Sequence, residues 1–168
     1  MLGFGVYGHY TWAQGWLLGA GLDQMFDDFE SPARILRIIQ PAGSTVVDAP
    51  AAATNLTAWI ERRYEAGARG AWYWQAGVGV GRVSADDVTG PVQGGGTYRI
   101  TTDADTELLL LGGLGYRYRI AGNWNLNSSV GLNYHFADWQ VRDLNSGAIG
   151  NVGNYAAYTI RLGIDYSF

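Results

Sequence analysis

The chain of 168 residues contains no cysteine, no lysine and only 4 prolines. Without cysteine, neither a disulfide framework nor a thiolate metal site can form. No apolar run approaches the length of about 18 residues that a transmembrane helix needs, and two glycines interrupt the longest run, 108–115. The net charge of −4 argues against a nucleic-acid partner. A helical membrane protein and a disulfide-stapled domain are therefore excluded, and a nucleic-acid-binding protein is disfavoured.

Glycine and aromatic residues are abundant, with 25 glycines and 14% aromatics, which is typical of strands and turns. In 124–136, apolar side chains alternate with Asn, Ser, Gly and His. Because successive side chains of a strand point to opposite faces, this period of two predicts a strand with one apolar and one small polar face. The same pattern predicts eight strands at 2–12, 16–27, 33–47, 55–67, 71–83, 106–120, 123–141 and 155–168. In 33–47 the alternation is broken by Arg34, Arg37 and Pro41.

The apolar faces carry aromatic residues at their ends and aliphatic residues in their middle. In a water-soluble sandwich or barrel, large aromatic rings on this face would crowd a small core. The observed order is instead expected where one face meets lipid and the rings lie at the two membrane interfaces. The opposite face is small and polar, as the interior of a narrow barrel requires, with glycines where bulk does not fit. The predicted aromatic girdle consists of Trp72, Trp74, Trp124, Tyr134 and Phe136.

Strand lengths and connections predict a closed barrel. A tilted membrane-spanning strand needs about 9–11 residues, so eight strands fit within the chain and leave room for loops. Short turns at 68–70 and 121–122, with 27–32, fall at one rim, while the long connections 84–105 and 142–154 fall at the other. An even strand number lets both termini lie at the same rim. The prediction is an all-β fold with one domain, 1–168: an eight-stranded antiparallel up-and-down transmembrane β-barrel.

The last strand, "YTIRLGIDYSF" (158–168), carries apolar residues at every second position up to a terminal Phe. The chain thereby resembles the small eight-stranded outer-membrane β-barrel proteins of Gram-negative bacteria, of the OmpA/OmpX type. The resemblance implies that the ending is a signal for the barrel-assembly machinery. It also implies the outer membrane as location, with membrane lipid and lipopolysaccharide as partners. The N-terminal segment has no signal peptide, so export implies that a leader was removed. The implied assembly signal is Ile160, Leu162, Ile164, Tyr166 and Phe168.

Charged side chains on the polar face are predicted to point into the barrel, where they must be paired or hydrated. An eight-stranded barrel is just wide enough for side chains to fill it, so an ion-pair network that plugs the lumen is favoured over a conducting or catalytic role. Asp23 joins the network if its strand register holds. The predicted lumen charge network is Glu61, Arg63, Glu65, Glu107, Arg117, Arg119, Arg161 and Asp165.

The two histidines, His9 and His135, are both predicted to face inward. The outer-membrane lipid A deacylases use a His–Ser pair two residues apart on a late strand, but here Ala137 takes the place of the serine. Two histidines alone also make a poor metal site. We therefore predict hydrogen-bonded lumen histidines, no catalytic residues, no bound metal and no cofactor.

Three functions remain open. The first is a structural or surface-interaction protein with a plugged lumen, which contacts a partner protein through loops 84–105 and 142–154. The second is a narrow channel for small solutes, with Trp59, Leu109 and Leu111 lining an interior path. The third is a lipid-modifying enzyme that uses His9 or His135. In loop 84–105, four aspartates also suggest a weak divalent-ion site that bridges lipopolysaccharide.

Overall fold

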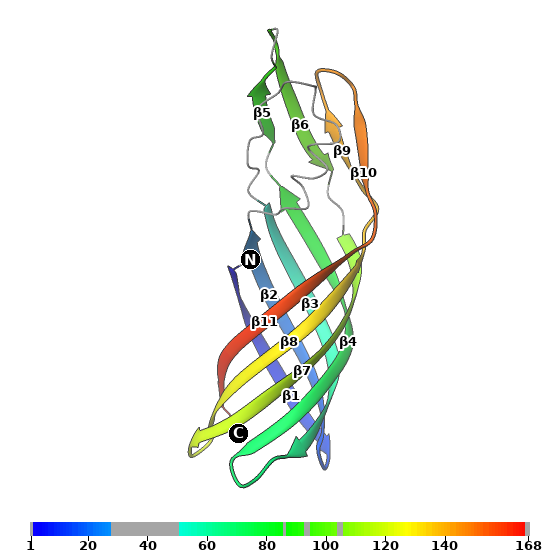
Figure 1. The fold of residues 1–168 in the computed structure, drawn as a ribbon. Helices are drawn as coiled ribbons and strands as arrows, with labels where there is room; N and C mark the ends of the chain where they lie inside the picture. Colours follow the sequence, from blue (N-terminus) through cyan, green and yellow to red (C-terminus); the bar gives the residue numbers. More distant parts are fainter. Residues whose placement is uncertain (1, 28–50, 86, 93–94, 104–105, 167–168) are drawn as a thin grey trace.

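The computed structural model describes residues 2–27, 51–85, 87–92, 95–103 and 106–166. This part of the chain forms two antiparallel β-sheets (Figure 1). The fold class predicted from the alternation, all-β, is confirmed. No helix among these residues is long and apolar enough to cross a membrane.

The larger sheet has seven strands in the order β1-β2-β3-β4-β7-β8-β11, and each strand pairs antiparallel with its neighbour. Its short connections, at 14–15, 66–69 and 122–123, all lie at one end, which we call the short-turn end. The strands are β1 (Leu2–Ala13), β2 (Trp16–Asp27), β3 (Ala51–Glu65), β4 (Gly70–Ala85), β7 (Thr106–Ala121), β8 (Trp124–Phe136) and β11 (Tyr155–Tyr166).

Seven of the eight predicted strands correspond to strands of this sheet: 16–27 has the predicted bounds, and the other six have shifted bounds. The strand predicted at 123–141 is divided into β8 and a strand of the second sheet. The predicted strand 33–47 lies outside the described residues. β2 pairs directly with β3, from Trp16 opposite Arg62 to Asp27 opposite Ala51, so the predicted position of a strand between them in the sheet order is wrong. The segment 27–32 was predicted at the short-turn rim, but this pairing places Asp27 at the other end of the sheet.

The edges of the seven-stranded sheet are β1 and β11, and a closed barrel is not found among the described residues. Because six antiparallel steps separate the two edge strands, they run in the same direction. The chain therefore enters the sheet at one end and leaves it at the other, so the prediction that both termini lie at one rim is wrong (Figure 1). The sheet curls strongly, since Arg161 of β11 reaches Asp23 of β2 and the ring of Tyr7 on β1.

The long connections form a second, four-stranded sheet, which we call the end sheet. The segments 84–105 and 142–154 were predicted as loops, but most of their described residues belong to two hairpins that pair with each other through β6 and β9. The strand order β5-β6-β9-β10 repeats the order β4-β7-β8-β11 of the larger sheet, so the end sheet continues those four strands. Its strands are β5 (Val88–Pro91), β6 (Thr97–Asp103), β9 (Trp139–Asp143) and β10 (Ile149–Val152).

The two sheets differ in which of their faces carries the apolar side chains. In the larger sheet the outward face is apolar and exposed: Val130, Ile160 and Leu110 expose 56%, 81% and 47% of their surface. Its inward face is buried and largely polar. In the end sheet this distribution is reversed: the apolar side chains are buried and the polar side chains are exposed. Its apolar cluster is Ala53, Val83, Val88, Tyr98, Ile100, Ala137, Trp139 and Val141.

Inward-facing glycines allow the larger sheet to curl. A Cβ on Gly77 would lie 2.2 Å from the carbonyl oxygen of Ala58 and 2.7 Å from the Cα of Trp59, both backbone atoms of the paired strand. A backbone held in a ladder cannot move aside, so we expect Gly77→Ala to lower the free energy of unfolding by about 1–3 kcal/mol. A Cβ on Gly112, which faces outward, meets nothing within 4 Å.

Gly112→Ala is therefore the matched control, with an expected change within about 0.5 kcal/mol. Urea-induced unfolding of both variants measures the difference. Equal stability of the two variants would contradict the steric role of Gly77.

Candidate functional site

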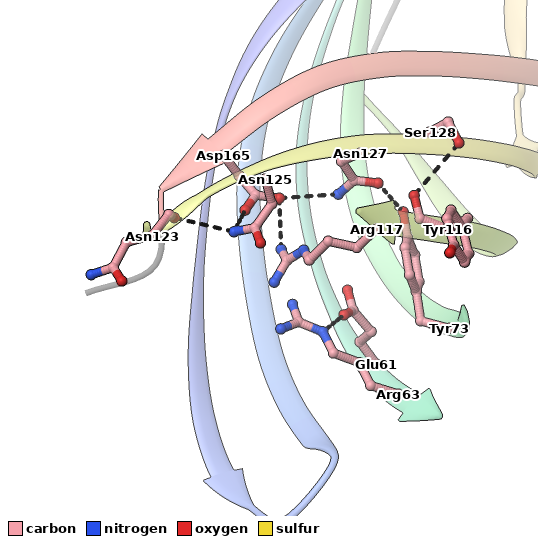
Figure 2. Close-up of polar contacts among 10 residues, drawn as sticks. All are labelled: Glu61, Arg63, Tyr73, Tyr116, Arg117, Asn123, Asn125, Asn127, Ser128 and Asp165. Atoms are coloured by element: carbon pink, nitrogen blue, oxygen red, sulfur yellow. Dashed lines mark hydrogen bonds and ion pairs between the residues drawn. The ribbon is translucent and has the colours of Figure 1, made fainter. Parts of the chain in front are cut away.

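Inward-facing polar side chains join strands that are not neighbours in the sheet (Figure 2). Arg117 of β7 forms an ion pair of 2.8 Å with Asp165 of β11, which skips over β8. Asn125 and Asn127 of β8 donate to the same carboxylate, at 2.9 and 3.4 Å. Tyr73 of β4 donates its hydroxyl to Asn127 at 2.6 Å. The network therefore ties four strands together through the interior of the curled sheet.

Nearer the end sheet, Glu107 is the centre of a second polar group. His135 Nδ1 lies 2.5 Å from Glu107 Oε1, and the Tyr155 hydroxyl donates to the same oxygen at 2.9 Å. The His135 and Tyr155 rings stack, with 4.5 Å between centroids and 7° between planes. Glu107 and His135 are buried, so these contacts offset part of the cost of removing a carboxylate from water.

Five of the eight predicted network charges form ion pairs, and a sixth, Glu107, contacts His135. Arg63 pairs with Glu61, and Arg161 lies 3.6 Å from Asp23, which confirms that Asp23 faces inward. Glu65 and Arg119 are exposed at the short-turn end and pair with no opposite charge among the described residues. The predicted network is therefore three separate ion pairs and a separate His135–Glu107 contact, rather than a single connected plug. Its charged members all lie on the strands that alternation assigned to them.

Sequence reasoning missed the neutral members of these groups: Tyr73, Asn125, Asn127 and Tyr155. The alternation does place each of them on the inward face. Their partners depend on how far one strand is staggered against the next, which the sequence pattern does not specify.

The two histidines differ. His135 is hydrogen-bonded inside the sheet as predicted. His9, opposite Gly19, also lies on the inward face, but it is exposed because β1 is an edge strand, and its ring has no hydrogen-bond partner within the described part of the chain. Ala137, where a catalytic serine would stand, is buried in the apolar cluster of the end sheet. Across the part of the chain that the structure describes, no three His, Cys, Asp or Glu side chains come together to hold a metal ion.

The predicted girdle and assembly residues share the outward face. Trp72, Trp124, Tyr134 and Phe136 are exposed, and Trp74 is half-buried against Trp16. Residues of the implied assembly signal are also exposed on β11, apart from Phe168, which lies outside the described residues. The exposed ones are Ile160, Leu162, Ile164 and Tyr166.

The hairpin between β9 and β10 is organised by Asp143. Its Oδ1 accepts hydrogen bonds from the backbone N–H groups of Arg99 at 3.2 Å and Asn145 at 3.1 Å, and its Oδ2 accepts one from Ser146 Oγ at 2.5 Å. Burial by itself raises the pKa of the Asp143 carboxyl, but the hydrogen bonds from Ser146, Asn145 and Arg99 outweigh burial and hold the pKa below its ordinary value.

A lowered pKa makes the end sheet sensitive to acid. The stabilisation by Asp143 is fully present above the unfolded-state pKa of about 3.9, and it is lost as pH falls through the lower folded-state pKa. We expect cleavage of the 139–152 hairpin by an acid-active protease to accelerate as the pH falls below about 4. Above about pH 4, the same protease should cleave Asp143→Asn faster than the parent, and the variant should lose most of this pH dependence. An unchanged pH profile in the variant would show that Asp143 does not control the hairpin.

Comparison with protein-family models, with curated proteins and with solved structures finds no match to this chain.

Proposed function

We propose that this protein is an integral outer-membrane protein of the small β-barrel type, with a packed polar interior and an end sheet that serves as a contact surface. One observation carries the proposal. Along 124–143 the outward face changes from apolar to polar and the inward face from polar to apolar, with the change between Phe136 and Asp138. A chain that passes from lipid into water requires this reversal, because the solvent outside the sheet changes there.

The size of the apolar outward face fits a bilayer. On β8, Trp124 and Tyr134 flank the aliphatic positions. Ten residue steps at about 3.3 Å each, tilted by about 40°, correspond to a height of about 25 Å, the height of the apolar band of outer-membrane barrels. An apolar patch of this extent on a water-soluble monomer would promote aggregation.

In lipid, the edges β1 and β11 must pair, because an open sheet edge inside the hydrocarbon leaves backbone groups without hydrogen bonds. The contacts of Arg161 with Asp23 and Tyr7 support closure, since they bring the two edges toward each other. The absence of native cysteine allows a clean test. Val6→Cys is combined in turn with Ile160→Cys, Leu162→Cys or Ile164→Cys. One of these three double variants should form a disulfide in lipid vesicles. If none of the three pairs cross-links, the barrel does not close at this seam.

The burial of the inward-facing side chains supports a packed interior rather than a conducting channel. Leu109 and Leu111, which would line the alternative solute path, expose 1% and 7% of their surface. The Trp59 ring lies so close to Gly19 that a Cβ there would be 2.2 Å from it, so this ring fills the interior. A water-filled path would leave such side chains accessible.

The end sheet presents a polar surface whose backbone is organised by its own apolar cluster and by the Asp143 hairpin. Exposed Arg99 pairs with Asp87 at 2.9 Å, and Gln140 and Arg142 are exposed beside it on β9. Such a folded surface suits contact with a partner protein or with lipopolysaccharide.

Planar-bilayer recording tests the packed interior. The full chain, refolded into lipid, should insert and pass no steady current. Steady current would favour the narrow channel instead. Failure of the chain to fold with lipid or detergent, while it folds in plain buffer, would overturn the membrane assignment itself.

A further inference from the structure

The outward face of the seven-stranded sheet carries only two charges among its described residues, Arg62 on β3 and Arg82 on β4. Arg62 lies near the short-turn end and Arg82 near the end sheet. All other described outward positions are apolar or uncharged, so the two arginines bound the apolar band at its two ends. A guanidinium at the margin of such a band extends toward the headgroup layer while its stem lies along apolar surface.

Arg62 is held by its neighbours in a fixed orientation. Its Nη1 donates to the backbone oxygen of Gln14 at 2.7 Å. The guanidinium carbon lies 5.1 Å from the ring centroid of Trp16 and 5.5 Å from that of Tyr64, within cation–π range. Trp74 contacts both of these aromatic residues. Its ring centroid lies 5.7 Å from that of Trp16, and its Nε1 donates a hydrogen bond of 3.4 Å to the Tyr64 hydroxyl.

No carboxylate pairs with Arg62 among the described residues. A guanidinium has five N–H donors, of which this one uses a single donor for Gln14. The remaining donors form a planar fork, the geometry that matches a phosphate. Two aromatic rings lie within cation–π range of the fork, and its unused N–H donors are the groups left for a ligand.

Tryptophan is concentrated at the same end. Every outward-facing tryptophan of the described sheet lies near a short turn, and two more tryptophans, Trp59 and Trp139, face inward. Tryptophan prefers the boundary between hydrocarbon and headgroups. The outward-facing tryptophans are Trp12, Trp16, Trp72, Trp74 and Trp124.

We propose that Arg62, framed by Trp16, Tyr64 and Trp74, binds the phosphate of an anionic phospholipid headgroup on the short-turn side of the membrane. This inference rests on the proposed membrane location. Arg82, exposed between the paired residues Thr54 and Thr106, lacks such a frame and is the natural control.

Tryptophan quenching by brominated lipid tests the site, because the outward tryptophans report on this end. The full chain is reconstituted in mixed vesicles in which either phosphatidylglycerol or phosphatidylcholine carries bromine on its acyl chains near the headgroup. Phosphatidylcholine has the same phosphate, but its trimethylammonium group compensates the charge. We expect the parent protein to prefer phosphatidylglycerol about fivefold.

Arg62→Gln should reduce this preference to near unity, Arg62→Lys should retain part of it, and Arg82→Gln should match the parent. Circular dichroism confirms that each variant is folded. A preference in folded Arg62→Gln equal to that of the parent overturns the phosphate site and leaves the membrane location intact. If neither brominated lipid quenches the parent, the membrane location fails, and the phosphate site fails with it.

Discussion

Val130→Arg is expected to lower the free energy of unfolding of the lipid-embedded protein by about 2–4 kcal/mol. Val130 points outward from β8, between Leu114 of β7 and Ile160 of β11, and exposes 56% of its surface. It lies near the middle of the apolar band, so an arginine there would place a charge near the bilayer centre. The same substitution at an exposed position of a water-soluble protein changes stability by about 0.5 kcal/mol or less.

Gln140→Arg supplies the matched control, since Gln140 is exposed on β9 of the end sheet. It should be close to neutral in the same vesicles. Urea titration of both variants in phosphatidylcholine vesicles measures the difference. If Val130→Arg costs no more than Gln140→Arg, the outward face of the larger sheet is not embedded in lipid.

Alternation predicted the faces of the larger sheet well. In 124–136 it correctly assigned Leu126, Val130 and Leu132 to one face and Asn125, Asn133 and His135 to the other. The reason is local: the period of a strand is set by backbone geometry alone, so each residue's side follows from its position. The same rule places Arg117, Asp165 and Tyr155 inside.

Partners and strand number are not local properties. Arg117 meets Asp165 only because β7, β8 and β11 are staggered by a particular register, which depends on the whole sheet. The end sheet was missed because β5 and β10 contain only four residues each, too few for a periodic signal. Its apolar cluster draws residues from β3, β4, β5, β6 and β9, which lie far apart in sequence.

The change of polarity was available in the sequence but was not used. One strand was predicted over 123–141, across Phe136 and on through Trp139 and Val141. Up to Phe136 the apolar residues of this segment occupy even-numbered positions, and after it they occupy odd-numbered positions. The apolar side chains therefore change from one face to the other. A short irregular step at Ala137–Asp138 separates β8 from β9 without changing the face on which side chains alternate. The sequence therefore contained the boundary between the two sheets.

Arg117→Met is expected to lower the free energy of unfolding by about 3 kcal/mol, at the low end of the range for breaking a buried ion pair. The Arg117 side chain exposes 9% of its surface, and its removal leaves the Asp165 carboxylate inside the sheet without a cation. Asn125 and Asn127 still donate to that carboxylate, and Asp165 keeps 22% exposure, so both features moderate the loss. Methionine retains most of the arginine stem, so the change reports mainly on charge.

The double variant Arg117→Met with Asp165→Asn separates pairing from packing. Removing both charges also removes the uncompensated carboxylate, so the double variant should be more stable than Arg117→Met alone by about 1–3 kcal/mol. Guanidinium-induced unfolding of the two single variants and the double variant in lipid completes the cycle. Additive losses would mean that Arg117 and Asp165 act independently and that the ion pair does not hold the curled sheet together. If the double variant loses much less unfolding free energy than the sum of the two single losses, this pair is a principal contact between the staggered strands β7 and β11.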